Sequence, residues 1–149
     1  MKKTIILLIT IVLTGQLYSQ HQVFKREQPV HQTIIKLFDA LSSRDSVSLK
    51  AYSTADITLY EYGQVWNIDT LILKAITLNQ AADFKRTNSF EFINTTTDIT
   101  MALVTYRLQS AITKDGKTAN VQWLETVVLV KTKKQWKVKH LHSTLIKRS

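Results

Sequence analysis

The stretch WKVKHLHST at residues 136–144 alternates with the period of two that is typical of a β-strand. One face of such a strand carries Trp136, Val138, His140, His142 and Thr144. The opposite face carries the lysines at 137 and 139, which we expect to point into water. The two histidines would then point into the fold, where each needs a hydrogen-bonding partner. The strand therefore predicts an interior that contains polar groups.

Three further segments upstream of this strand also have β character. The sequence predicts strands over residues 84–93, 99–113, 118–132 and 136–146. Lys114-Asp115-Gly116-Lys117 predicts a tight hairpin between two of them, because Asp-Gly readily adopts the positive φ that such turns need. Strands joined in sequence by hairpins form an antiparallel sheet. Two of these segments far exceed the ~5–6 residues of a typical strand, so the sheet must bend.

The first half of the chain has mostly helical patterns. Residues 23–41 place apolar residues at helical spacing, and Asp45 is a plausible cap for a short helix through Tyr52. A strand over 57–66 and a helix over 68–78 follow, the latter capped by Asn67 or Asp69. Helices that precede a sheet must cover one of its faces. The prediction is an α+β fold: a cone-shaped, curved antiparallel sheet with the N-terminal helices packed on its concave face.

The N-terminus has the composition of an export signal. The chain begins MKKTIILLITIVLTGQLYSQ, with two lysines, an apolar run and a small residue at Ser19. We expect a signal peptide over 1–19, cleaved near Ser19-Gln20, and one domain over 20–149. The apolar run is shorter than the ~20 residues that span a bilayer, so we expect no stable membrane anchor. The expected location is periplasmic or extracellular.

Composition excludes several kinds of site. The chain of 149 residues has no cysteine, which removes disulfides, thiolate catalysis and cysteine metal ligands. Its three glycines do not form a phosphate-binding loop. The formal charge is +9, but the late lysines lack the interleaved aromatic residues of a nucleic-acid site. We interpret them as a solvated face and expect no nucleic-acid partner.

Acid–base residues share the predicted concave face. Glu61, Glu125, His140 and His142 lie at positions expected to point inward, and carboxylate beside imidazole is a workable proton-transfer pair. Trp123 shares the phase of Glu125 and is expected to line a pocket. The alternative is that His142 and Glu125 satisfy each other, with His140 bonded to backbone. Two histidines and a carboxylate can hold a metal ion, but a third ligand at clear spacing is missing, so no metal site is predicted.

The order helix, helix, strand, helix and long strands, closed by WKVKHLHST, resembles the nuclear transport factor 2-like superfamily. Within it, residues 22–146 are most similar to the SnoaL-like and ketosteroid-isomerase-like branch of exported bacterial proteins. This resemblance implies a cystatin-like cone that often forms a homodimer through its sheet. The superfamily contains isomerases, dehydratases and non-catalytic binding proteins, so the fold alone does not fix the function.

The resemblance to ketosteroid isomerase also implies roles for particular residues. Its general base would fall near Glu61 in ITLYEYG, and its second acid near Glu125 in QWLETVV. Its third group, a tyrosine on the first helix, would fall at Leu37 and is missing. Leucine cannot donate a hydrogen bond to an oxyanion, which puts the steroid-isomerase mechanism in doubt.

We expect an exported cone that binds a small, partly apolar molecule without a cofactor. Its site would contain the tentative catalytic residues Glu61, His142 and Glu125, and the ligand-binding residues Trp123, His140, Tyr60 and Thr144. Two alternatives stay open. One is a cofactor-free lyase or isomerase with Glu61 as base and His142 or Glu125 as acid. The other is a non-catalytic, dimeric interaction protein.

Overall fold

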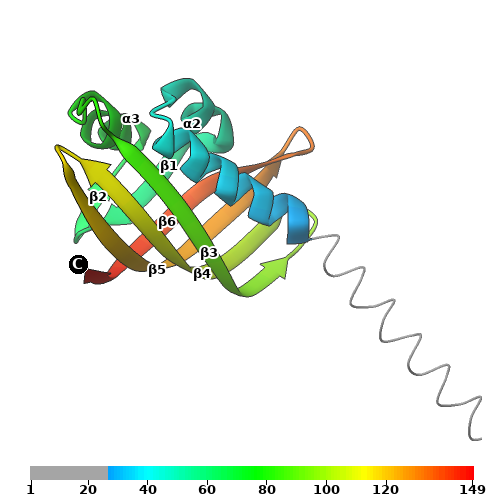
Figure 1. Cartoon of the computed structure of the whole chain (residues 1–149). Coiled ribbons are helices and arrows are strands. Elements are labelled where there is room, and N and C mark those ends of the chain that lie inside the picture. Colours follow the sequence, from blue (N-terminus) through cyan, green and yellow to red (C-terminus); the bar gives the residue numbers. More distant parts are fainter. Residues whose placement is uncertain (1–26) are drawn as a thin grey trace, which may run out of the picture.

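A curved sheet forms the body of the described chain (Figure 1). The structure is a computed structural model that describes residues 27–149, and the predicted signal peptide lies outside them. The six strands have the order β2-β1-β6-β5-β4-β3. Their bounds are Ser53–Glu61 (β1), Gln64–Trp66 (β2), Lys85–Thr97 (β3), Met101–Lys114 (β4), Lys117–Thr132 (β5) and Gln135–Arg148 (β6).

Strand pairing agrees with the prediction for β3 to β6, which form a continuous antiparallel meander. β1 instead pairs in parallel with β6, so the sheet is mixed. The segment 57–66, predicted as one strand, belongs to two strands that pair as a hairpin. Tyr62 and Gly63 turn the chain between them with φ values of 50° and 72°. The predicted turn at Asp115 and Gly116 is confirmed by their φ values of 52° and 71°.

The helices cover the concave face of the sheet, as predicted (Figure 1). Residues 27–42 are helical and cross the long strands. Helix α2 (Ser46–Tyr52) begins where the Asp45 carboxylate accepts hydrogen bonds from the amides of Val47 and Ser48. Helix α3 (Ile68–Ile72) is capped by Asn67 and continues as a turn of π-helix over Leu73–Thr77. No helix in the described part of the chain is long and apolar enough to cross a membrane.

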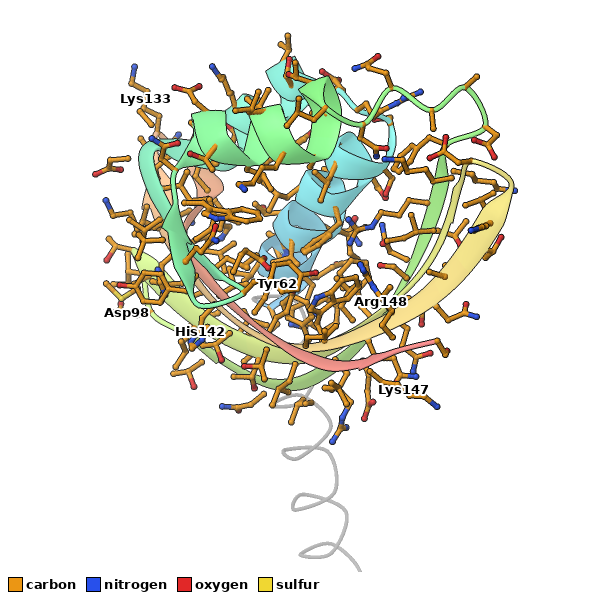
Figure 2. The ribbon with its side chains drawn as sticks, turned by 90° about the vertical axis from the view of Figure 1, so that its left-hand side faces the viewer. Tyr62, Asp98, Lys133, His142, Lys147 and Arg148 are labelled. Carbon is orange, nitrogen blue, oxygen red and sulfur yellow. The ribbon has the colours of Figure 1, made fainter. Side chains whose placement is uncertain are left out.

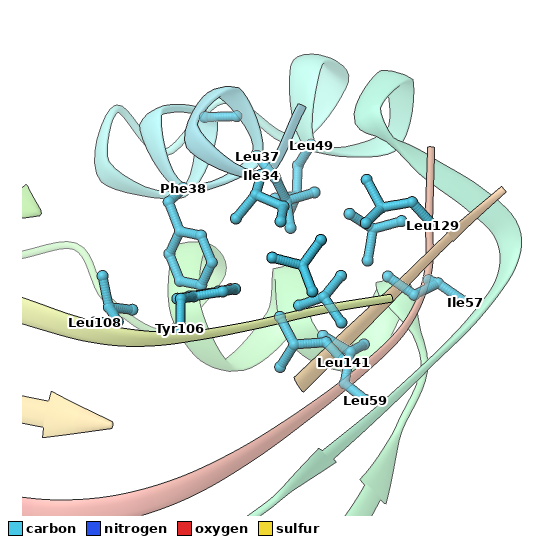
Figure 3. Packing of buried hydrophobic residues seen from close by; sticks show 14 of the residues in the cluster. Ile34, Leu37, Phe38, Leu49, Ile57, Leu59, Tyr106, Leu108, Leu129 and Leu141 are labelled. Carbon is cyan, nitrogen blue, oxygen red and sulfur yellow. The ribbon is translucent and has the colours of Figure 1, made fainter. Parts of the chain in front are cut away.

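The hydrophobic core lies between these helices and the sheet (Figure 3). Ile34 and Phe38 come from the first helical segment, and Leu49 comes from α2. They meet apolar side chains from the concave face of the sheet, which include Ile57, Leu59, Tyr106, Leu129 and Leu141. Burial of this surface drives the packing of the helices onto the sheet.

The side chains of β6 change faces partway along the strand, so the predicted alternation is wrong for its second half. Val138 pairs with Leu129 and His140 pairs with Val128, so Lys139 is an extra residue that makes a bulge. After the bulge, Leu141 and Ser143 are buried, at 2% and 9% exposure. A bulge moves every later side chain to the other face. Trp136 and Val138 are inside as predicted, but the prediction that the rest of the face points inward is wrong for His140, His142 and Thr144.

Figure 2 shows the result of this reversal, with His142 on the outer side of the sheet. A second register shift lies near the end of β6, between the pairs Trp123–Leu145 and Gln122–Lys147. Arg148 then pairs with the buried Val121 and lies on the inner side, while Lys147 lies on the outer side (Figure 2).

Candidate functional site

Two glutamates meet at one serine on the concave face of the sheet. Glu61 ends β1, Ser143 lies in β6, and Glu125 lies opposite Ser143 in β5. The Ser143 Oγ atom is 2.8 Å from Glu61 Oε1 and 2.8 Å from Glu125 Oε1. The three side chains therefore form one continuous polar chain across three neighbouring strands.

This chain requires a proton on one of the carboxyl groups. A serine hydroxyl has a single hydrogen, and an ionised carboxylate can only accept. If Ser143 donates to one glutamate, the short contact to the other is a hydrogen bond only when that glutamate is protonated and donates to Oγ. Burial raises the pKa of Glu125 to about 7, against the opposing effect of the Tyr106 and Ser143 hydroxyls. Glu125, with the larger rise in pKa, is therefore the group on which we expect the shared proton below about pH 7.

The deepest part of the site contains two polar atoms without partners. Tyr106 faces Glu125 across the β4–β5 pairing. Its hydroxyl oxygen and Glu125 Oε2 are both buried, and neither has a partner of good hydrogen-bond geometry among the described residues. The two groups are nevertheless close enough for each to shift the pKa of the other. Burial also raises the pKa of Tyr106 well above its ordinary value, so the phenol stays protonated and able to donate. Buried polar groups that lack a good hydrogen bond are stabilised when a ligand or a water molecule provides one.

Arg86 brings a positive charge into the same interior from β3. Its guanidinium lies over two aromatic rings, with Cζ 5.4 Å from the Phe38 ring centroid and 5.6 Å from that of Trp123. Nε donates to Asn88 Oδ1 at 2.9 Å, and Nη2 donates to Ser110 Oγ at 3.2 Å. Burial lowers the pKa of Arg86, while Glu125 and Glu61 act to raise it.

Arg86 and the carboxyl groups do not touch. Among the described residues, Arg86 makes no ion pair within 4.0 Å with Glu61 or Glu125. The carboxyl pKa of Glu61 is raised, mainly by burial, although Ser143 and Arg86 oppose this. Opposite charges that share an interior without contact leave part of their desolvation cost uncompensated. The polar groups therefore share one interior region without neutralising each other by direct contact.

The site is reached from the Glu61 side. Tyr106 and Glu125 are 0% and 3% exposed, while Glu61 and Arg86 keep part of their surface accessible. Two hollows are lined by other residues. One of about 350 Å³ is lined by residues of β3, β4 and β5, among them Thr87, Gln109 and the two partners of Arg86, Asn88 and Ser110. Another of about 340 Å³ lies near Lys50 and Asp69. Neither is lined by the glutamates.

The structure brings together only part of the residue set expected from the sequence. Glu61, Glu125 and Trp123 share the interior, the last through its contact with Arg86. The other four residues lie on the outer face: Tyr60, His140, His142 and Thr144. There the Thr58 hydroxyl is 2.8 Å from His140 Nδ1, and the Tyr60 ring contacts both histidines. The alternative in which His142 pairs with Glu125 is wrong, because the two residues point to opposite faces.

Sequence reasoning missed Arg86, Tyr106 and Ser143. Arg86 shares the phase of Phe90 in the predicted strand 84–93, and Tyr106 shares that of the buried Val104, so alternation alone offered a signal for both. Ser143 offered none, because unbroken alternation through β6 assigns it to the outer face. The described residues contain no group of three or more histidine, cysteine, aspartate or glutamate side chains that could hold a metal ion.

Comparison with known proteins identifies the fold. Residues 30–146 match the family model of the SnoaL-like domain. An NTF2-like protein from Cytophaga hutchinsonii is 18% identical, with a TM-score of 0.65 over 78% of this chain and 95% of that one. A ketosteroid isomerase-like protein from Erwinia carotovora atroseptica is 18% identical, with a TM-score of 0.64 over 78% and 93%. The CaMKII hub of S. rosetta is 21% identical, with a TM-score of 0.66 over 80% and 95%.

At these identities the structural likeness establishes the fold alone, and it confirms the predicted nuclear transport factor 2-like architecture. The same architecture occurs in a protein described as isomerase-like and in a hub domain. The comparison with curated proteins found no match. The function therefore has to be argued from the residues of the site.

Proposed function

The chain belongs to the SnoaL-like domain family, and from this premise we propose that it binds a small, partly apolar molecule at the interior glutamates. The observation that carries the proposal is the pair of neighbouring buried atoms, Tyr106 Oη and Glu125 Oε2, neither of which makes a hydrogen bond of good geometry among the described residues. A ligand with a polar head group would complete both. Aromatic rings of Phe38, Phe90 and Trp123 surround the same region and suit an apolar body.

A titration followed by two-dimensional amide NMR tests this proposal, with phenol and benzamide as probes. We expect saturable shifts of the backbone amides of Glu61, Arg86, Glu125 and Ser143. Shifts confined to the outer hollow around Thr87 and Gln109, or the absence of saturable shifts with either probe, would reject an interior site.

A second candidate function is cofactor-free proton transfer, favoured by the Glu61–Ser143–Glu125 chain. Glu61, ionised and partly accessible, would remove a proton from carbon next to a carbonyl group. Protonated Glu125 and the Tyr106 hydroxyl would donate hydrogen bonds to the oxygen that gains negative charge. Tyr106 would thereby supply, from a strand, the phenol that is missing at Leu37 on the first helical segment. The expected alternative acid, His142, has no part in this version.

Deuterium exchange at the α-carbon of 2-tetralone in D₂O measures this activity directly. We expect the protein to accelerate exchange and Glu61→Gln to reduce the protein-dependent rate by ~10²-fold or more, because glutamine cannot accept the proton. An unchanged rate in Glu61→Gln would remove Glu61 as the base while leaving binding intact.

We also propose that the protein is exported and forms a homodimer through its sheet. Export is supported by the sequence of residues 1–19. Dimerisation is supported by exposed apolar side chains on the outer side of the sheet, including Leu103 and Leu124 at 41% and 42% exposure. A hub domain among the structures of the same fold is consistent with assembly. Sedimentation velocity at micromolar concentration would show a mass of twice the monomer, and a monomer would contradict the dimer.

A further inference from the structure

Arg86 has hydrogen-bond donors to spare. An arginine guanidinium has five N–H groups and stays charged in a protein interior. Nε and Nη2 each donate once, to Asn88 and Ser110, and Nη1 donates to none of the described residues. Asn88 is itself fixed, because it accepts from Ser110 Oγ at 2.7 Å and donates to Ser42 Oγ at 2.8 Å. Three of the five N–H groups of Arg86 therefore make no hydrogen bond to the described residues.

Two aromatic rings help to hold the guanidinium in place. Phe38 and Trp123 contact it at 5.4 and 5.6 Å, which limits its rotation. A planar cation held in this way presents its edge to an acceptor and loses little freedom when it binds one. Flat ligands would lie against the same aromatic surface.

The charges of Arg86, Glu61 and Glu125 balance, and the further inner-side cation, Arg148, is exposed to solvent. Arg86 contributes one positive charge, and the Glu61–Glu125 pair contributes one negative charge while it shares a single proton through Ser143. An uncharged ligand preserves this balance. A carboxylate would add a buried negative charge, which is costly unless the glutamate pair takes up a second proton.

We propose that Arg86 determines the ligand class of the interior site, by donating from its unused N–H groups to the carbonyl oxygen of an uncharged head group, an amide or a ketone, carried on a flat apolar body. This inference rests on the proposed binding function and adds the chemistry that the site selects. Charge selection comes from the glutamate pair, and the geometry of the hydrogen bond comes from Arg86.

Benzamide and benzoate test the proposal, because they have nearly the same shape and differ in charge. Dissociation constants are measured by NMR titration from about pH 6 to about pH 8, with the Arg86 Nε–H signal as a local reporter. At about pH 8 we expect benzamide to bind about tenfold or more tightly than benzoate. Benzoate affinity should rise as the pH falls, by at most about tenfold per pH unit, because its entry takes up a proton.

Two arginine variants separate the role of Arg86 from a general effect of charge. Arg86→Lys keeps the positive charge but loses the planar fork, and should weaken benzamide binding about tenfold or more. Arg107→Gln is the matched control: Arg107 is exposed on β4 and pairs with Glu91 at 3.0 Å, so its loss should leave binding unchanged. Thermal unfolding of both variants verifies that each is folded at the titration temperature.

Four results would overturn the proposal. Tighter binding of benzoate than of benzamide at about pH 8 would identify a carboxylate site instead. Unchanged benzamide affinity in Arg86→Lys, with shifts still at Glu61 and Glu125, would reject Arg86 alone and leave the proposed function standing. Failure of phenol, benzamide and benzoate alike to bind the wild-type protein would reject the proposed function and this inference together, whereas binding of phenol alone would reject only this inference.

Discussion

Replacing Leu141 with alanine is expected to lower the free energy of unfolding by about 3 kcal/mol. Leu141 follows the bulge in β6 and is 2% exposed. It pairs with Leu59 in β1 and with Val127 in β5, and both of these side chains are also buried. Alanine would leave a cavity among three strands that cannot collapse into it easily. Urea unfolding at constant pH measures the change.

His142→Ala is the matched control one position along the same strand. His142 is exposed on the outer face, so its loss should change the free energy of unfolding by no more than about 0.5 kcal/mol. Uninterrupted alternation from Trp136 predicts the opposite ranking, with His142 buried and Leu141 in water. A larger loss for His142→Ala than for Leu141→Ala would show that the bulge at Lys139 is absent in solution.

The elements of the fold were predictable because each depends on local sequence. Asp45 caps α2 and Asp115-Gly116 forms the hairpin turn, since a carboxylate beside free amides and a tolerance of positive φ act within a few residues. The bulge at Lys139 depends instead on the register between β5 and β6. Lys139 also forms an ion pair with Asp56, a residue far away in the sequence. Alternation within β6 contains no sign of either contact.

The same error affected the candidate site. Alternation predicts the inner face correctly for Glu61 in β1 and for Trp123 and Glu125 in β5, because neither segment contains an extra residue that would reverse it. The histidines were placed there by an alternation that the bulge reverses. Ser143 took their position, so the bridge between the glutamates could only be seen once the register was known.

Replacing Glu125 with glutamine is expected to change the pH dependence of stability. The carboxyl pKa of Glu125 is raised from 4.5 to about 7 in the folded protein by burial. The native state therefore holds its proton more tightly than the unfolded chain does. The stability linked to this proton is fully present below about pH 4.5 and is lost as the pH rises through about 7. The shift corresponds to about 3 kcal/mol, and the amide side chain of the variant cannot ionise.

Urea unfolding of both proteins at steps from about pH 5 to about pH 8 tests this expectation. We expect the wild-type protein to lose about 3 kcal/mol relative to Glu125→Gln over the full titration, with most of the change complete near pH 7. Glu91→Gln serves as the control, because Glu91 is exposed and pairs only with Arg107 on the surface. The difference in free energy of unfolding between Glu91→Gln and the wild-type protein should stay nearly constant across this pH range. A constant difference for Glu125→Gln as well would mean that Glu125 titrates like a solvated carboxyl group, and the proton-sharing chain through Ser143 would then have no basis.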